Sequence, residues 1–287
     1  MTVNLTVCAR TDIGKRKTNE DAFVIADLTG SGLVMTAPIT RFEIGAHGVL
    51  LAVSDGMGGH AAGEVASALV VESLRRSMAA AAASTESDTL LPRAVERANR
   101  DAWEASQTPG REGMGATVTA LFLDGATAHI AEVGDSRAYL LRGGELLQVT
   151  RDQSYVQLLV DAGTLKPEDA ARAPFRNVIM QAMGQKPDVQ VALGKLALRQ
   201  KDCFLVCSDG LTNKVEPHEI ARTILGAPRL DVACERLIAL ALERGGDDNI
   251  TAILGGVSGD LPPLVAGESI ASTLEVVQEW GAPPPGP

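Results

Sequence analysis

The sequence predicts an α+β fold in which antiparallel β-sheets pack against layers of helices. Short apolar runs rich in Val, Ile, Leu and Thr recur along the chain, most of them bounded by Gly or Asp. Two pairs of runs adjoin through Asp124-Gly125 and Gly143-Gly144, dipeptides that are typical of hairpins. Strands are followed by two helical segments and then by more strands. This order favours layered α+β packing over alternating βαβ units.

The strand-like runs are spread over most of the chain. They cover residues 3–10, 21–28, 48–55, 117–124, 127–135, 137–144, 145–150, 202–209 and 249–257. From residue 258 onward the pattern decays. Residues 258–287 are expected to form a partly disordered tail, with at most one amphipathic turn in SIASTLEVVQEW.

Helical spacing interrupts the strands in five places. The segments are 63–83, 91–107, 155–162, a stretch beginning at Ala170, and 231–244. Pro92 suits a first helical turn, and Gly245-Gly246 supplies a stop for the last helix. With 287 residues and 45% hydrophobic content, the chain is long enough for one large domain or two small ones.

Composition excludes several functions. The balance of 26 basic against 36 acidic residues gives a net charge of -10, which argues against nucleic acid as the main partner. The four cysteines form no CxxC pair, and Cys203 and Cys207 lie in an apolar run, so we expect reduced thiols and a cytoplasmic protein. The N-terminus does not resemble a signal peptide. No apolar run approaches the ~18 residues of a membrane span.

Aspartates recur where apolar runs end or meet a glycine. They are Asp21, Asp55, Asp135, Asp209 and Asp248. Any single one is explained as a turn former, but strand ends share a rim, so all of them can converge. Converging carboxylates repel one another unless cations hold them together. Oxygen ligands of this kind suit Mg²⁺ or Mn²⁺, and the scattered His and apolar Cys disfavour zinc.

The glycine-rich stretch DGMGGHAAGE carries a second signal. Three glycines in four positions, beginning at Gly56, let the backbone turn sharply and bring a carbonyl to an ion. The stretch lacks the lysine of a P-loop, so it is not a nucleotide cradle of that type. The alternative is an ordinary turn from strand to helix.

Six motifs in order carry a family resemblance. They are RKTNEDAF, SDGMGGHAAGE, GMGATVTA, VGDSRAYL, CSDGLTN and GGDDNIT. Together they resemble the metal-dependent serine/threonine protein phosphatases (type 2C, or PPM) in their bacterial form, over residues 5–257. The resemblance implies a central sandwich of two antiparallel sheets flanked by pairs of antiparallel helices, a four-layer αββα fold. It also implies a catalytic domain over residues 1–257, and a monomer as the family default.

The resemblance also implies a ligand set for two core ions, Mn²⁺ or Mg²⁺, and a third, weaker ion. Asp55 matches the carboxylate that bridges both core ions, with the Gly56 carbonyl on one of them. Asp209 and Asp248 match ligands of the first ion, and Glu20 and Asp21 match the acidic pair beside the second. Asp135 matches a ligand of the third. Asp247, the neighbour of Asp248, is more ambiguous and is not assigned as a ligand, because the family motif DNIT begins at Asp248.

The implied chemistry is hydrolysis of phosphoserine and phosphothreonine in proteins. Two cations lower the pKa of a shared water, and the resulting dimetal-bound hydroxide attacks phosphorus directly. Arg16 matches the family's phosphate-binding arginine, whose guanidinium can pair two phosphate oxygens. Lys15 and Lys17 are expected to form a solvated basic edge. The implied partners are phosphoproteins, with a cytoplasmic Ser/Thr kinase whose action the enzyme reverses.

Two positions depart from common family patterns. Met57 stands where many relatives have a proton-donating His, so we expect a metal-bound water to act as the acid, with His60 as the alternative. Gln153 stands where family members often have His. It opens the segment 152–184, which in the family lies beside the active site, so we expect an effect on substrate preference rather than on chemistry.

Three other functions are alternatives. The same centre could hydrolyse small phosphate esters. An inactive relative that binds phosphoproteins is disfavoured, because Asp55, Asp209 and Asp248 are all present. A structural calcium module is disfavoured because the aspartates lack EF-hand spacing.

Overall fold

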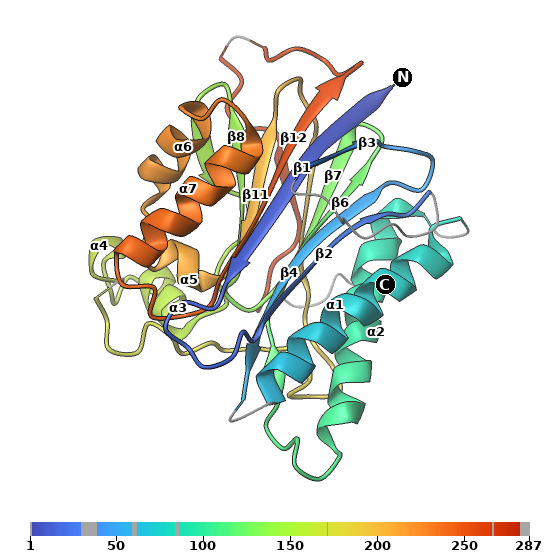
Figure 1. The fold of residues 1–287 in the computed structure, drawn as a ribbon. Coiled ribbons are helices and arrows are strands. Elements are labelled where there is room, and N and C mark those ends of the chain that lie inside the picture. Colours follow the sequence, from blue (N-terminus) through green and yellow to red (C-terminus); the bar gives the residue numbers. More distant parts are fainter. Residues whose placement is uncertain are drawn as a thin grey trace.

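Two β-sheets stacked face to face form the centre of the molecule, with helices on both outer faces (Figure 1). The computed structural model describes residues 2–29, 39–58, 62–83, 86–170, 172–265 and 267–281. The four-layer αββα fold expected from the sequence is confirmed.

The first sheet has six strands, and every neighbouring pair runs antiparallel. In spatial order they are β3 (Thr40–Glu43), β1 (Val3–Asp12), β12 (Ile250–Gly259), β11 (Cys203–Cys207), β8 (Arg137–Arg142) and β9 (Glu145–Gln148). Strand β1, the first of the described strands, thus lies between β3 and β12 and pairs with β12 along its whole length.

The second sheet has seven strands and is also antiparallel throughout. In spatial order they are β13 (Leu274–Gln278), β10 (Ala192–Ala197), β7 (Thr127–Val133), β6 (Val118–Asp124), β4 (Val49–Met57) and β2 (Asp21–Asp27), with β5 (Gly115–Ala116) pairing the end of β4. Strand β4 is an unbroken buried run from Val49 to Ser54 because it is covered on both faces.

The two predicted hairpins are confirmed. In β6–β7, Asp124 pairs with Thr127, so the loop is Gly125-Ala126. In β8–β9, Arg142 pairs with Glu145 across Gly143-Gly144. Both glycines of the second loop have positive φ, +59° and +92°, which a two-residue hairpin turn of this kind requires.

Helices cover each outer face in antiparallel pairs. Helices α1 (Ala62–Ala81) and α2 (Ser87–Ser106) pack on the seven-stranded sheet, and α6 (Pro217–Leu225) and α7 (Leu230–Glu243) pack on the six-stranded one (Figure 1). The short helices α3 (Tyr155–Asp161), α4 (Pro167–Ala170) and α5 (Asp209–Thr212) lie in connections. Among the described residues, no helix is both long and apolar enough to cross a membrane.

Three apolar clusters separate the four layers. One lies between α1–α2 and the seven-stranded sheet, one fills the sandwich, and one lies between the six-stranded sheet and α6–α7. The sandwich cluster includes Leu5, Leu51 and Phe204, all fully buried. Because both sheets are held on both faces, the strand ends that form the rim have little freedom to move.

Several elements differ from the sequence-based expectation. Strands β3, β5, β10 and β13 and helices α5 and α6 were not predicted. The turn expected in SIASTLEVVQEW is strand β13, which pairs with β10 through an irregular register at Leu193/Gly194. Gly194 and Lys195 break the apolar alternation of β10, which explains why the sequence did not reveal this pair.

Two helix boundaries were also wrong. Helix α2 begins four residues earlier than expected, so Pro92 lies inside it rather than in its first turn. The helix expected to begin at Ala170 instead ends there, and α4 starts at Pro167. Pro174 lies close downstream and disfavours helical backbone in the residue before it, which limits extension in that direction.

A buried ion pair fastens the C-terminal segment to the sandwich. Arg142 is 3% exposed and donates to both carboxylate oxygens of Asp202, at 2.7 and 2.6 Å. The same guanidinium donates to the Ala197 carbonyl and to Thr273 Oγ1, at 2.9 and 2.8 Å. One side chain thus connects β8, the end of β10 and the residue that precedes β13.

Replacing Arg142 with Met should strongly destabilise the fold. The change keeps an apolar stem but leaves the fully buried Asp202 carboxylate without a cation, and we expect the free energy of unfolding to fall by about 3 kcal/mol. Urea unfolding followed by circular dichroism measures this. The matched control is Arg76→Met on the exposed face of α1, where a surface pair contributes under about 1 kcal/mol. Equal losses in the two variants would contradict the role of Arg142.

Candidate metal centre

The aspartates that end or begin strands meet at one rim of the sandwich. Asp21 at the start of β2 is the direct partner of Asp55 at the end of β4. Asp209 follows β11, Asp135 follows β7 and Asp248 precedes β12. A cavity of about 310 Å³ opens there. It is lined by Arg16, Glu20, Asp55, Gly56, Met57, Gly58, Thr117, Asp135, Asn177, Ile179, Asp209, Asp248 and Asn249.

Asp21 is the one predicted ligand that does not line this cavity. Asp21 lies next to Asp55 on the neighbouring strand, and Ser208 Oγ donates to its Oδ2 at 2.7 Å. The other oxygen, Oδ1, is buried and has no hydrogen-bond partner among the described residues. Glu20 thus lines the cavity, whereas Asp21 does not.

Burial and mutual repulsion raise the pKa values of the carboxyl groups. Burial, followed by the charges of Asp21 and Asp209, raises the pKa of Asp55 well above its usual range. Burial raises the pKa of Asp21 to about 6 and that of Asp135 to about 8, the nearby Asp209 adding to both. The pKa of Asp209 is raised by burial and by Asp248. Without cations, the ionised site is therefore a source of strain.

These residues fit divalent cations with oxygen ligands. The Oδ1 atoms of Asp21 and Asp209 are both buried and lack a partner within the described ranges, although each is an acceptor that needs one. No three His, Cys, Asp or Glu side chains of the described residues already form a compact metal-binding group. Negatively charged carboxylates repel one another and stay apart, and bound cations would draw them together.

The backbone at Gly56 allows a close approach that no other residue would permit. Its N–H donates to the Glu20 carbonyl at 3.0 Å. A Cβ at position 56 would lie 2.1 Å from the carbonyl oxygen of Gly63, at the start of α1. The end of β4, the segment before β2 and the start of α1 therefore meet in van der Waals contact, with Gly56 on the cavity wall.

The loop before β2 is locked to the loop before β12. Arg16 Nη2 donates to Asp248 Oδ2 at 2.7 Å. Asn249 accepts the Glu20 N–H at 2.8 Å and donates to the carbonyls of Ile13 and Thr18 at 2.9 and 3.0 Å. Asn249 stands in the GGDDNIT motif, but its role was not predicted from the sequence. Its amide positions Glu20 and Arg16 relative to Asp248.

The structure separates Asp248 from its neighbour Asp247. Asp248 lines the cavity, while Asp247 is exposed and forms ion pairs with Lys15, at 3.5 Å, and with Lys214. Lys15 and Lys17 are both exposed, as expected of a solvated basic edge. Asp248 is thus the residue of this pair that could contact an ion.

Thr117 is a further residue of the site that was not predicted from the sequence. Its Oγ1 accepts the Asp55 N–H at 2.9 Å and shares a 2.7 Å hydrogen bond with Ser136 Oγ, next to Asp135. Its N–H donates to the Asp55 carbonyl at 2.8 Å. The motif GMGATVTA contained this residue, but only the tertiary contacts reveal that it fixes two of the aspartates.

Met57 and Gln153, the two positions that depart from common family patterns, lie in different surroundings. Met57 lines the cavity, and Gln185 Nε2 lies 3.5 Å from its sulfur. His60 lies outside the described residues. Gln153 is fully buried: its side chain donates to the Glu132 carbonyl and accepts the Gly134 N–H, at 3.1 and 3.0 Å. Gln153 therefore braces the turn that carries Asp135.

Comparison with known proteins places this chain in a family. Residues 39–250 match the family model described as protein phosphatase 2C. The serine/threonine protein phosphatase PstP of Mycobacterium tuberculosis is 41% identical over 230 residues, which cover 76% of this chain and 43% of that protein. Protein phosphatase PhpP of Streptococcus pneumoniae is 34% identical over 250 residues, covering 85% of this chain and 94% of that one.

Solved structures agree with the sequence relatives. A crystal structure of the M. tuberculosis phosphatase superposes with a TM-score of 0.75 at 36% identity, over 90% of this chain and 100% of that chain. The catalytic domain of PstP in complex with two manganese ions gives a TM-score of 0.73 at 36% identity, with the same coverage. The chain belongs to the protein phosphatase 2C family, in its bacterial form. It spans about two fifths of the length of the M. tuberculosis relative.

Asp55→Asn should stabilise the protein when metal is absent. The change removes a buried charge that Asp21 and Asp209 repel, so the free energy of unfolding in excess chelator should rise. We expect a gain of about 1 kcal/mol, a common size for a stabilising single substitution. Thermal melting with chelator and with Mn²⁺ measures the effect. With Mn²⁺ the wild type should be the more stable of the two. A variant that melts lower than wild type in both conditions would contradict the electrostatic interpretation.

Proposed function

We propose that the chain is a metal-dependent phosphatase that hydrolyses phosphoserine and phosphothreonine in proteins. The observation that carries this proposal is the meeting of Asp55, Asp209 and Asp248 beside Arg16 at one rim. Carboxylates provide ligands for cations, and a guanidinium at their edge provides a site for phosphate. Two of the relatives are named serine/threonine phosphatases and a third is named a protein phosphatase, which supports the substrate class.

The proposed ligand set follows the cavity. Asp55 would contact both core ions, with the Gly56 carbonyl on one of them, Asp209 and Asp248 on the first ion and Glu20 on the second. Asp21 would help to hold the second ion, directly or through water. Asp135 would hold a third, weaker ion. When bound, Mn²⁺ or Mg²⁺ would lower the pKa of a water and offset the charge of the phosphate.

Arg16 would orient the phosphoryl group. Its side chain is about half exposed and lines the cavity. One N–H group of the guanidinium pairs with Asp248, so its other N–H groups can bind an incoming phosphate. A planar guanidinium binds two phosphate oxygens at once and thereby fixes the direction of attack. Asn249 keeps this loop in place through the carbonyls of Ile13 and Thr18.

The leaving alkoxide needs a proton, and Met57 cannot supply one. Asp135 lies on the cavity wall, where its turn is braced by Thr117 through Ser136 and by Gln153 through Gly134. We assign the acid function to water held at Asp135. This assignment explains how a site with Met57 can protonate a serine or threonine oxygen.

The cellular setting is also part of the proposal. We place the enzyme in the cytoplasm, opposite a Ser/Thr kinase, as a monomer with its catalytic domain in residues 1–257. The four cysteines are free and buried, which supports a reducing compartment.

The decisive experiment is hydrolysis of phosphothreonine, phosphoserine and phosphotyrosine peptides beside p-nitrophenyl phosphate, with and without Mn²⁺. The proposal expects metal-dependent turnover, with kcat/KM at least about tenfold higher for phosphothreonine or phosphoserine peptides than for phosphotyrosine. Full activity in exhaustively chelated protein would reject the metal mechanism. Activity on p-nitrophenyl phosphate alone would instead indicate small phosphate esters as substrates.

Arg16→Ala should weaken substrate binding without removing the core ions. We expect KM for a phosphothreonine peptide to rise at least about tenfold with a smaller loss in kcat, since a charge-assisted hydrogen bond contributes roughly 1.5–3 kcal/mol. Steady-state kinetics and a calorimetric metal count measure both effects. Lys17→Ala, at an exposed position in the same basic run, is the matched control. An unchanged KM for Arg16→Ala would make Arg16 a surface residue.

Asp135→Ala should slow the enzyme more on phosphopeptides than on p-nitrophenyl phosphate. Serine and threonine alkoxides need protonation to leave, whereas nitrophenolate leaves without it. We expect kcat to fall at least about tenfold for the peptide and less than threefold for p-nitrophenyl phosphate, with two ions still bound by calorimetry. Equal losses on both substrates would remove the acid role. Loss of all metal would make Asp135 a ligand of the core pair.

A further inference from the structure

A second and larger cavity lies away from the aspartate rim, at the open edge of the sandwich. Its volume is about 560 Å³, within the range of pockets that bind small organic molecules. The walls come from β7, β10 and β13 of one sheet and from the end of β9, the loop after it and α3 on the other side. The cavity therefore forms where the edge strands β13 and β9 of the two sheets diverge.

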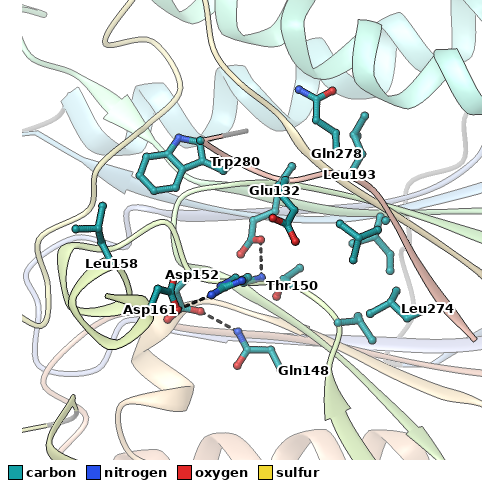
Figure 2. Close-up of a pocket in the computed structure, with 18 residues that line it drawn as sticks. Glu132, Gln148, Thr150, Asp152, Leu158, Asp161, Leu193, Leu274, Gln278 and Trp280 are labelled. Carbon is teal, nitrogen blue, oxygen red and sulfur yellow. Dashed lines mark hydrogen bonds and ion pairs between the residues drawn. The ribbon is translucent and has the colours of Figure 1, made fainter. Parts of the chain in front are cut away.

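Apolar side chains form part of the wall of this cavity. Figure 2 shows Trp280 and Leu158 on one side and Leu274 on the other, with the Glu132 carboxylate between them. Leu158 is 40% exposed, so it stands at the mouth. An aromatic ring and aliphatic side chains around an open volume favour a ligand with an apolar body.

Glu132 gives the cavity a polar centre. Its side chain is almost completely buried, at 2% exposure, and Oε2 accepts the Arg151 N–H at 2.8 Å. The second oxygen, Oε1, has no hydrogen-bond partner among the described residues. A buried carboxyl oxygen without a partner is rare, because leaving it unsatisfied costs roughly 1–3 kcal/mol. Burial also raises the pKa of Glu132 well above its usual range.

The charges around Glu132 indicate the sign of the missing partner. Asp152 is already paired with Arg137, which donates to both of its oxygens, and Asp161 is paired with Arg151 at 2.5 Å. These two carboxylates are thus neutralised by cations of the chain. Glu132 is the buried carboxyl of this cavity that no cationic side chain of the described residues pairs. An ammonium group would supply both the hydrogen-bond donor and the charge that Oε1 lacks.

We propose that this cavity binds a small amphipathic amine, with its ammonium group on the Glu132 carboxyl group and its apolar body between Trp280, Leu158 and Leu274. The indole of Trp280 adds a face that attracts cations. The site is separate from the phosphatase proposal, because none of its lining residues lines the aspartate cavity.

The test uses three probes with the same number of non-hydrogen atoms: 4-phenylbutylamine, 4-phenylbutan-1-ol and 3-phenylpropionate. Calorimetry on the full chain measures the affinities. We expect saturable binding of the amine, at least about tenfold tighter than the alcohol or the carboxylate. The chain has two tryptophans, so in a Trp103→Phe background the fluorescence of Trp280 should change on titration with the amine.

Two variants and one control locate the binding. Glu132→Gln keeps the shape but removes the charge, and should bring the amine within about threefold of the alcohol. Leu158→Lys changes an exposed position at the mouth and places a competing ammonium there, so it should weaken the amine at least about tenfold even if Glu132→Gln fails to fold. Glu96→Gln, at an exposed position on α2, should leave binding unchanged.

Three results would overturn the proposal. They are no saturable binding of the amine up to about 10 mM, equal affinities for the three probes, or an amine affinity that Leu158→Lys leaves intact. The first would mean that water alone satisfies Glu132, since a polar cavity of this size can hold ordered water. All three measurements are independent of phosphatase activity, so the failure of either proposal leaves the other standing.

Discussion

Repulsion between carboxylates buried at one rim is the constraint that the rest of the structure must withstand. Asp21 and Asp55 face each other across β2 and β4, and Asp209 lies close enough to raise the pKa of both. A flexible rim would let these groups separate into water. Three apolar clusters prevent this, because they hold each sheet on both faces and fix the strand ends from which the aspartates project.

The carboxylates of the rim are held mainly by neutral donors. Ser208 donates to Asp21, Asn213 donates to Asp209, and Thr117 holds the backbone of Asp55. Apart from Arg16, which pairs with Asp248, the cationic side chains nearby are paired with other carboxylates, as when Arg137 pairs with Asp152. Hydroxyls and amides orient a carboxylate without neutralising it, so the negative charge stays available to an ion. A lysine or arginine in their place would compete with that ion.

The sequence revealed features that depend on local pattern and missed those that depend on tertiary contact. Both hairpins were predicted because glycine pairs specify the turn, and the aspartates were predicted to converge because strand ends share a rim. Strand β10 was missed because Gly194 interrupts its pattern. Asn249 and Thr117 were missed as site residues because their roles consist of hydrogen bonds to backbone atoms that are distant along the chain.

Strand β7 connects the two cavities of the molecule. Glu132 near its end lines the large cavity, and Asp135 follows three residues later at the aspartate rim. The Gln153 side chain forms hydrogen bonds with the backbone of Glu132 and of Gly134, within this short segment. The backbone carbonyl of Gln153 accepts the Met180 N–H at 2.8 Å, next to Ile179, which lines the aspartate cavity.

The family motifs end near residue 257, yet β13 and Trp280 line the large cavity beyond that point. The residues that carry the proposed chemistry therefore end before residue 258, whereas the folded sandwich continues to β13.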